Sequence, residues 1–513
     1  MYQLLTPKGY SPNITELSVS AWFYRNRTIA GFDNPARSLY VSIRELVENS
    51  LDACEDERVL PEVSVFLHRE DDSREQDLIR SGPEIYELMV KDNGKGIKRN
   101  DIPVLIGKML TGTKFTLRQS RGTFGLGGSL ALLYGQVTTQ EPIEVVTGRR
   151  DEPYGHRVVM RLDIETNQPN IIEEERISKS PDESGTMISF QLQGDWIRSK
   201  RRIIEYFSQT AIIVPHASLL LETPEGDMLK FDRLIDNLPV APKEMKPHPR
   251  GIDVEMLKKM IGATRAKDLK SFMKRSFQRV GISTAEEFLQ YSQLDKRRVP
   301  SSLQQNELVS MMNALASYKR FLPPSPKSLS PAGTSVLMAG VQRLSPDFAV
   351  FRQRAPNVYE GHPFIIETGI AYGGGLGAGV KIYRFANRIP LLYDERSDVS
   401  YRVVRNLNLK HYGLRQDDPI AFVVHICSTK IPYKTVGKEY LGDVDILRRE
   451  IELGFKDCLR ELSEKVRKRN RVHKQRKRET RLVNYYQFMS ETLSAILERE
   501  ISIKKLFSSL GDE

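Results

Sequence analysis

The chain is 513 residues long, too long for one ordinary domain, and at roughly 150 residues per domain its length suggests about three domains. Apolar residues make up 40% and charged residues 28%, a balance that is typical of folded globular proteins and excludes a largely disordered chain. The net charge of +11 favours polyanionic partners without identifying one.

The cysteines and the hydropathy narrow the class further. Cys54, Cys427 and Cys458 lie far apart without a CxxC spacing, so neither a disulfide framework nor a zinc module is predicted, and a reducing cytoplasm fits. The first residues lack a basic flank followed by an apolar segment, and no run reaches the roughly 18 apolar residues that a membrane span needs. We therefore expect neither export nor insertion into a membrane.

Residues 35–195 combine the patterns of amphipathic helices and of alternating strands, which indicates helices packed on a sheet. Strands are predicted at 85–92, 143–148 and 185–193, and a hairpin is predicted around 224–227. The Pro-rich segment that follows can continue neither a helix nor a central strand, so we interpret it as a linker.

The second half of the chain begins with short helices between residues 252 and 320, a small all-helical module that ends at another Pro-rich joint. Strands are then predicted within 362–374, 380–393 and 419–433, followed by a long helix from about Val444. That helix enters a basic run, residues 465–481, which we interpret as a solvated face or a phosphate-contacting segment. The predicted boundaries divide the chain into residues 1–235, 236–324, 325–470 and 471–513.

A helix over residues 43–55 would carry two different faces. At 100° per residue, one face holds the apolar side chains Ile43, Val47, Leu51 and Cys54, and the other holds Glu45, Asn49 and Asp52. A polar stripe of this kind is often a plain solvated face. A second carboxylate placed elsewhere changes that interpretation.

The second carboxylate is Asp92, at the end of a predicted strand and before a turn that contains two glycines, which allow a close backbone approach. Further on, a glycine-rich loop precedes a helix that is predicted to begin near Ser129. Such a loop offers backbone N–H groups and a helix N-terminus to phosphate oxygens. The P-loop pattern GxxxxGK[ST] is absent from the sequence, so phosphate binding by that route is not predicted.

In chain order these elements resemble the GHKL nucleotide-binding fold, with "SGTMISF" at the position of the family's last box. Segments such as "NPARSLYVSIRELVENSLDA", "GHPFIIETGIAYGG" and "CSTKIPYKTVGKE" extend the resemblance along nearly the whole chain to the B subunits of archaeal type IIB topoisomerase VI. The resemblance implies an α+β protein with a GHKL ATPase α/β sandwich, a helix, two turns, helix module, a transducer α/β domain and C-terminal helices.

The resemblance also implies roles for single residues. Glu45 matches the general base that deprotonates the attacking water, Asn49 the ligand of Mg²⁺, and Asp92 the acceptor that reads adenine. Lys438 matches the transducer lysine that reaches the γ-phosphate of ATP. Thr113 and Lys114 match the start of the ATP lid, and its phosphate-binding end comprises Gly122, Thr123, Phe124, Gly125, Leu126, Gly127, Gly128 and Ser129.

By the same resemblance, ATP would drive dimerisation of two B subunits around a DNA duplex. The two B subunits would form a heterotetramer with two A subunits, and this complex would be located in the cytoplasm, at the nucleoid. Neither acidic pair that could pass for a DNA-cleaving metal site, at 225–227 or 443–445, follows a buried strand. We therefore expect the A subunit to cut DNA and to dock partly through the region from Leu482 to Phe507.

One segment departs from the family pattern: where a Trp-Lys-x-Tyr sequence is usual, this chain has Leu409, Lys410, His411 and Tyr412, which puts a stacking role on DNA in doubt. Two alternatives remain open from the sequence. One is another GHKL ATPase, such as a sensor kinase, a heat-shock chaperone or a mismatch-repair ATPase. The other is a DNA-binding scaffold without catalysis, which would not need the full set of site residues.

Overall fold

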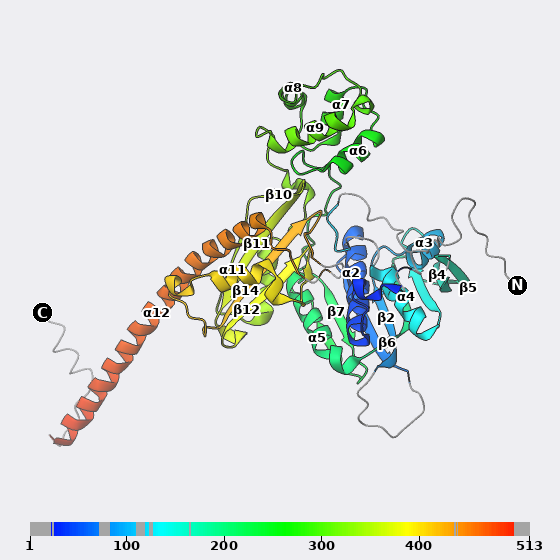
Figure 1. The fold of residues 1–513 in the computed structure, drawn as a ribbon. Coiled ribbons are helices and arrows are strands. Elements are labelled where there is room, and N and C mark those ends of the chain that lie inside the picture. Colours follow the sequence, from blue (N-terminus) through cyan, green and yellow to red (C-terminus); the bar gives the residue numbers. More distant parts are fainter. Residues whose placement is uncertain are drawn as a thin grey trace.

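Three bodies make up the computed structural model: a large sheet covered by helices, a small helical module, and a second sheet from which a long helix extends (Figure 1). The structure describes residues 22, 25–70, 83–108, 118–122, 127–163, 166–434, 438 and 440–496. The mixed α+β fold class predicted from the sequence is confirmed.

The first sheet has eight strands in the order β5-β4-β3-β6-β2-β1-β7-β8. Neighbouring strands are antiparallel except for β1 and β7, which are parallel. The predicted strands correspond to β2, β3 and β6, and the predicted hairpin to β7 and β8. The strand bounds are β1 Glu62–Arg69, β2 Glu84–Asp92, β3 Ile143–Gly148, β4 Gly155–Asp163, β5 Gln168–Ile177, β6 Gly185–Gly194, β7 Ser218–Glu222 and β8 Met228–Phe231.

Three helices lie side by side against this sheet: α2 (Pro35–Glu57), α4 (Gly127–Thr139) and α5 (Trp196–Ile213). Helix α2 begins where it does because the side chain of Asn34 accepts a hydrogen bond from the backbone N–H of Arg37, 2.9 Å away, and Pro35 occupies the first turn. Helix α4 begins two residues before the predicted start near Ser129, so Gly127 and Gly128 belong to its first turn. A short helix, α3 (Ile102–Gly107), packs on α4 and on β5.

The helical module contains α6 (Val254–Ala263), α7 (Leu269–Ser276), α8 (Ile282–Tyr291) and α9 (Gln305–Ser317), in agreement with the helices predicted there. Asp253 and Asp268 cap α6 and α7 by accepting hydrogen bonds from backbone N–H groups three residues on, each at 2.7 Å. The module has a core of its own, built around Phe272, Phe288 and Met311. It therefore forms a separate packing unit at the end of the linker.

The second sheet has the order β10-β11-β14-β12-β13, and β9 also pairs with β11. Every residue of β14 is buried, which fits a strand that is covered on both faces. The bounds are β9 Phe348–Gln353, β10 Asn357–Tyr359, β11 His362–Tyr372, β12 Val380–Ala386, β13 Ile389–Pro390 and β14 Ile420–Ser428.

Each face of the second sheet packs against a different partner. On one face Phe385 and Val423 join the core of the first body, which includes Ile212 of α5 and Leu337 of α10 (Thr334–Val341). On the other face the strands pack on α11 (Val399–Asn406) and on α12 (Asp445–Ile496). The two sheets are thus joined through one continuous apolar core.

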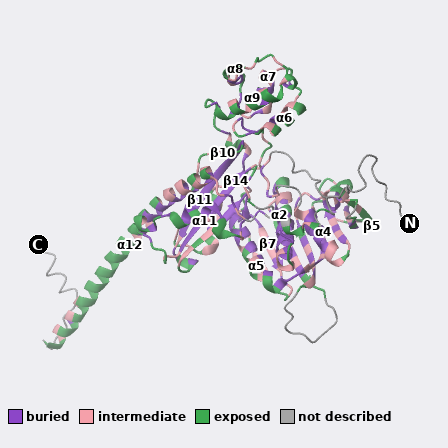
Figure 2. Cartoon of the chain, in the orientation of Figure 1, coloured by how far each residue is buried: buried purple, intermediate pink, exposed green. Residues whose placement is uncertain are grey.

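Helix α12 leaves this body about halfway along its length (Figure 1). Residues 470–485 are exposed throughout, and Figure 2 shows the far half of the helix coloured almost entirely as exposed. Large apolar side chains are exposed there, namely Leu482, Tyr485, Phe488 and Ile496 at 52%, 60%, 67% and 70%. Within the described residues, no helix is both long and apolar enough to cross a lipid bilayer.

Candidate active site

A cavity of about 460 Å³ lies between α2, the turn after β2, the start of α4 and the segment that carries Lys438. This volume is in the range of ordinary small-molecule sites. All of the predicted site residues that the structure describes line it: Glu45, Asn49, Asp92, Gly122, Gly127, Gly128, Ser129 and Lys438. The other six, Thr113, Lys114, Thr123, Phe124, Gly125 and Leu126, lie outside the described residues.

Helix α2 supplies the polar wall of the cavity. Residues 38–51 of this helix are buried with the exception of Asn49, which is exposed toward the cavity that it lines. Glu45 lies one turn earlier on the same side of the helix, because residues four apart are neighbours on a helix surface. The acidic stripe is therefore not a solvated face but the wall of a pocket.

Four charged side chains meet at the inner end of the cavity. Arg44 donates a hydrogen bond to Oε1 of Glu45 at 2.6 Å, and its Nε lies 3.3 Å from Oε1 of Glu48. Lys438 donates to Oε2 of Glu48 at 3.1 Å and lies 3.4 and 3.5 Å from the two carboxylate oxygens of Glu45. All four are at least nine-tenths buried, so two positive and two negative charges compensate each other away from water.

The protonation of this cluster follows from its geometry. Burial alone would raise the pKa of Glu45, but the Lys438 ammonium and the Arg44 guanidinium outweigh it and lower that pKa to about 2. For Glu48 burial is the largest influence and, together with the neighbouring Glu45, it outweighs Lys438 and Arg44, so the pKa of Glu48 is raised. Burial would lower the pKa of Lys438, yet the two glutamates raise it, so the lysine stays charged.

Lys438 comes from the segment between β14 and α12, almost four hundred positions away from Glu45. Its backbone has φ of 54°, in the left-handed region that is unfavourable for a residue with a side chain. Such conformations cost of order 1–3 kcal/mol and persist where the surroundings hold them, often at functional sites. Here the bonds of the ammonium group to two buried carboxylates hold the residue in place.

Asp92, at the end of β2, also lines the cavity. Its Oδ1 accepts hydrogen bonds from the backbone N–H groups of Gly94, at 2.9 Å, and of Thr186, at 3.3 Å. Thr186 is the second residue of β6, as the sequence predicted, and its hydroxyl lies 3.1 Å from that of Thr147. Burial outweighs these bonds and raises the pKa of Asp92. The carboxylate is thus fixed in orientation at the cavity wall.

The start of α4 approaches α2 so closely that side chains would not fit. A Cβ atom on Gly127 would lie 1.7 Å from Oε2 of Glu45, and one on Gly128 would lie 2.8 Å from Nδ2 of Asn49. Glycine at both positions brings the positive end of the helix dipole and its first N–H groups next to these two side chains. An anionic group such as a phosphate would be stabilised at this point.

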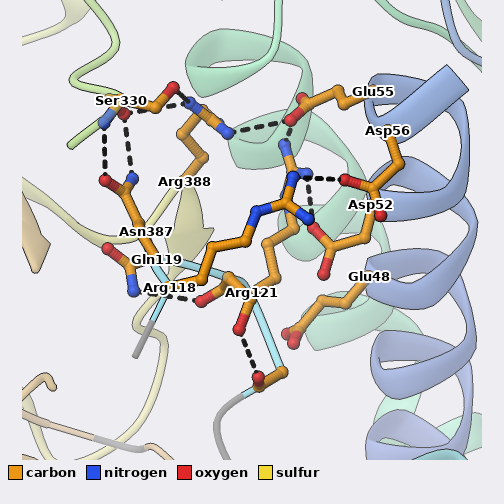
Figure 3. A network of polar contacts seen from close by, with 12 residues as sticks. Glu48, Asp52, Glu55, Asp56, Arg118, Gln119, Arg121, Ser330, Asn387 and Arg388 are labelled. Carbon is orange, nitrogen blue, oxygen red and sulfur yellow. Dashed lines mark hydrogen bonds and ion pairs between the residues drawn. The ribbon is translucent and has the colours of Figure 1, made fainter. Parts of the chain in front are cut away.

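Several residues of the site were not predicted from the sequence. Glu48 and Arg44 belong to the charge cluster, and their spacing of four residues was a signal that the pattern offered. Asp52, which the helical pattern places on the polar face without assigning it a role, lies at the cavity and accepts a hydrogen bond from Arg121 at 2.9 Å. Figure 3 shows that Arg121 belongs to a network which also includes Asn387 and Arg388 of the second sheet. Nothing in the local sequence marks these contacts.

The segment that departs from the family pattern forms a 3₁₀ turn, Leu409–Tyr412. Leu409 is buried in the core of the second sheet's outer face, whereas Lys410 and His411 are exposed. The backbone carbonyl of Tyr412 accepts a hydrogen bond from Ser463 of α12 at 2.8 Å. Leu409 therefore has a packing role, and Lys410 remains accessible to a phosphate.

Comparisons with known proteins agree with this geometry. Residues 34–192 match the family model described as histidine kinase-, DNA gyrase B- and HSP90-like ATPase, and residues 324–478 match that of the topoisomerase VI B subunit transducer. The type 2 DNA topoisomerase 6 B subunit of Metallosphaera sedula is 37% identical over 494 residues, 95% of this chain and 90% of the relative. That of Sulfurisphaera tokodaii is 36% identical over 487 residues, 94% and 89% of the two chains.

Among solved structures, the 43K ATPase domain of Thermus thermophilus gyrase B, in complex with an aminocoumarin, aligns at 13% identity with a TM-score of 0.37, covering 89% of this chain and 98% of that one. The relatives decide the assignment, because their similarity extends over nearly the full length of both chains. These relatives set this chain apart from the kinase, chaperone and repair ATPases considered above. The chain belongs to the family of type 2 DNA topoisomerase 6 B subunits.

Proposed function

We propose that this chain is the ATP-hydrolysing B subunit of a type IIB DNA topoisomerase. Binding of ATP would dimerise two B subunits around a DNA duplex and gate its passage through a double-strand break made by an A subunit, so that supercoils are relaxed and DNA circles decatenated. The observation that carries the proposal is the meeting of Lys438 with Glu45 in a cavity that Asn49 and Asp92 also line. A cavity bounded by both bodies would let one nucleotide control how they are joined.

In this proposal Glu45 accepts the proton of the attacking water and Lys438 stabilises the charge that shifts onto the leaving phosphate oxygens. A carboxylate with a pKa of about 2 is a weak base. Glu45 would gain basicity when Lys438 moves from the two glutamates to the γ-phosphate. Binding of the nucleotide and activation of the base would then be one event.

Asn49 would hold Mg²⁺, which supplies positive charge to the phosphates when bound. Within the described part of the chain, no group of three or more His, Cys, Asp and Glu is placed to hold a metal ion. The Asn49 side chain lines the cavity with its amide group next to Gly128 at the start of α4, and its carbonyl oxygen would serve an ion whose remaining ligands are waters and phosphate oxygens. The donor set of the cavity is thus compatible with Mg²⁺ bound together with ATP.

Asp92 would accept a hydrogen bond from the exocyclic amine of adenine, for which its fixed orientation is suited. The glycine-rich end of the lid and the first turn of α4, including Ser129, would bind the phosphates through backbone N–H groups. In this proposal the adenine and the phosphates would lie in one cavity, and we extend the phosphate-binding role to Thr113, Lys114 and residues 123–126 of the lid.

The proposed partners follow from α12 and from the contacts of the two acidic pairs. The region from Leu482 to Phe507 would dock the A subunit, giving a heterotetramer of two A and two B chains at the nucleoid. Residues 482–496 of this region expose large apolar side chains, and residues 497–507 lie outside the described residues. The basic run of α12 is exposed and could contact DNA. Of the two acidic pairs, Glu225 bonds to Trp196 and Lys200, and Asp443 to Arg402 and Arg448, so both have structural contacts.

The proposal is tested by measuring ATP hydrolysis and oligomeric state of the full-length chain. The parent should hydrolyse ATP and should form a dimer with a non-hydrolysable analogue, and Glu45→Gln should lower kcat by roughly 10²–10⁴-fold while binding is kept. Glu452→Gln, at an exposed ion pair of α12, is the matched control. With the A subunit added, plasmid relaxation should require ATP. A chain that stays monomeric with the analogue, or a Glu45→Gln variant as fast as the parent, would refute the proposal.

A further inference from the structure

The base of the lid, residues 118–121, is held from two sides (Figure 3). This short segment ends next to Gly122, which lines the cavity, so its position fixes where the phosphate-binding end of the lid begins. Its side chains and carbonyl groups bond to the second half of α2 on one side and to the second sheet with its preceding segment on the other.

On the α2 side the contacts are ionic. Arg121 donates to Asp52 at 2.9 Å and to Oε1 of Glu55 at 2.6 Å, and Arg118 donates to Asp56 at 2.6 Å. Arg121 is 1% exposed, so these bonds are made away from water, where they are strong. The acidic stripe of α2 thus continues beyond Asn49 and ends at the base of the lid.

On the other side the contacts come from the transducer part of the chain. The Gln119 amide exchanges two hydrogen bonds with the backbone of Ser330, at 2.9 and 2.8 Å. Asn387, in the tight turn between β12 and β13, donates from Nδ2 to the carbonyl of Ser120 at 3.0 Å. Two polar side chains therefore tie the lid base to the second sheet's body.

Arg388 joins the two sides. It donates to Oε2 of Glu55 at 2.8 Å and to the carbonyl and hydroxyl oxygens of Ser330 at 3.1 and 2.9 Å. Since Arg121 occupies the other oxygen of Glu55, one carboxylate links a residue of the lid to a residue of the transducer. With Asp52 included, two arginines face two carboxylates, so the buried charges balance.

The turn that carries these two residues is held in an unfavourable conformation. Asn387 and Arg388 have φ of 47° and 65°, both in the left-handed region. The turn is braced from inside the sheet, because the backbone N–H of Arg388 donates to His425 at 3.0 Å and the Asn387 amide exchanges bonds with Ser428. His425 in turn contacts Glu367 at 2.7 Å, and all these groups are buried. A strained turn with this much support is suited to placing two side chains accurately.

We propose that Asn387 and Arg388 are positioning residues of the nucleotide site, through which the transducer sets the placement of the lid and hence the affinity for ATP. Both residues line the edge of the cavity, and their contacts with Ser120 and Glu55 act on the site through the lid base and Arg121. This inference rests on the proposed function. It adds to Lys438 a second, separate link between the two bodies. A shift of the second sheet relative to α2 would pull the lid base as well as the lysine.

The test uses Asn387→Asp in the full-length chain, because aspartate tolerates the left-handed backbone and keeps the acceptor for the Ser428 N–H but loses the Nδ2 donor that bonds the carbonyls of Ser120 and Ser428. We expect the KM for ATP to rise about tenfold, the cost of one hydrogen bond at a positioned site, with kcat changed less than KM. Hydrogen exchange of backbone amides 118–122 should quicken without nucleotide. Arg388→Gln should have the larger effect, and Arg388→Lys, which keeps the charge, an intermediate one.

The matched control is Arg354→Gln, which removes an arginine of the same body that pairs with Glu450 and Asp457 at 3.0 and 3.2 Å, away from the lid. A merely structural role would give the Asn387 and control variants the same KM and the same exchange of residues 118–122, and that result overturns the inference. If the parent hydrolyses ATP, this failure leaves the proposed function intact. A parent that binds no ATP would overturn both.

Discussion

Replacing Lys438 by methionine should destabilise the chain by unbalancing a buried charge cluster. Methionine keeps the aliphatic stem and deletes the ammonium group, which leaves Arg44 alone opposite Glu45 and Glu48. The side chains of the two glutamates are 9% and 2% exposed, so water compensates little of the loss.

The loss of unfolding free energy can be estimated in two ways, from the pKa of Glu45 and from the usual cost of breaking a buried ion pair. Lowering the pKa of Glu45 from 4.5 to about 2 corresponds, at 1.36 kcal/mol per pH unit, to a net of roughly 3 kcal/mol that remains after Lys438 and Arg44 have offset the effect of burial. Removing one partner of a buried ion pair costs about 3–5 kcal/mol. Because Lys438 also serves Glu48, we expect Lys438→Met to lose about 3 kcal/mol of unfolding free energy.

The pH dependence of the stability of Lys438→Met tests this account of the charge cluster separately. Without the lysine, the pKa of Glu48, which burial already raises, should rise further, so the folded variant would retain a proton that the unfolded chain releases. A folded-state pKa above the unfolded value makes stability fall as pH rises above about 4.5. Lys438→Met should therefore be less stable at pH 8 than at pH 5.

The assay is urea unfolding followed by the fluorescence of Trp196, which is 1% exposed at the start of α5 and reports on the first body. The double variant Lys438→Met with Glu48→Gln restores one positive against one negative charge, and it should recover at least half of the loss and remove the added pH slope. A single variant within about 1 kcal/mol of the parent, or a double variant less stable than the single one, would refute this account of the cluster.

Three further outcomes are expected. Asp92→Asn keeps an acceptor for Gly94 but turns an amino group toward adenine, so ATP should bind at least about tenfold more weakly in equilibrium titration, and unchanged affinity would contradict the assigned role. Gly127→Ala would place a Cβ 1.7 Å from Glu45, so kcat should fall by about 10²-fold while the circular dichroism spectrum is kept; a kcat near that of the parent would show that the close approach is dispensable. Burial raises the pKa of all three cysteine thiols, that of Cys458 to about 12. A thiol reagent at pH 8 should therefore label the chain only after unfolding. Rapid labelling of the native chain would show that a cysteine is accessible.

The local elements of this fold could be predicted because their signals lie within a few residues of each other. The periodicity of residues 43–55 identified the buried face of α2, and the turn residues 224–227 identified the hairpin of β7 and β8. The helices of the small module carry their own caps, such as Asp253 and Asp268. Boundaries were less accurate, as for α4, whose first turn consists of glycines that normally weaken a helix.

The burial of the polar stripe could not be predicted from the helix alone. A stripe of carboxylates on an amphipathic helix has the same pattern whether water or another domain covers it. Here a segment far along the chain covers it and brings Lys438 to Glu45 and Glu48. The family resemblance was what pointed to that lysine, and periodicity carried no information about it.

The lid-base network was missed entirely because it joins three distant segments. Arg388 and Glu55 are 333 positions apart, and the contact depends on the register of β12 and on the strained turn that follows it. Neither Arg121 nor Arg388 has an acidic neighbour in sequence that would suggest a partner. Contacts of this kind become visible only when the two bodies are packed together.

The length of α12 converts small motions into large ones. With 52 residues the helix is about 78 Å long at 1.5 Å per residue, and its first half is packed on the second sheet while residues 470–485 of its far half are exposed. A tilt of the sheet by about 10° would move the tip of the projecting half, about 39 Å long, by roughly 7 Å relative to the point where the helix leaves the sheet. A protein bound at that tip would therefore be displaced much farther than the sheet itself, which would shift by only about one or two ångströms where the helix leaves it.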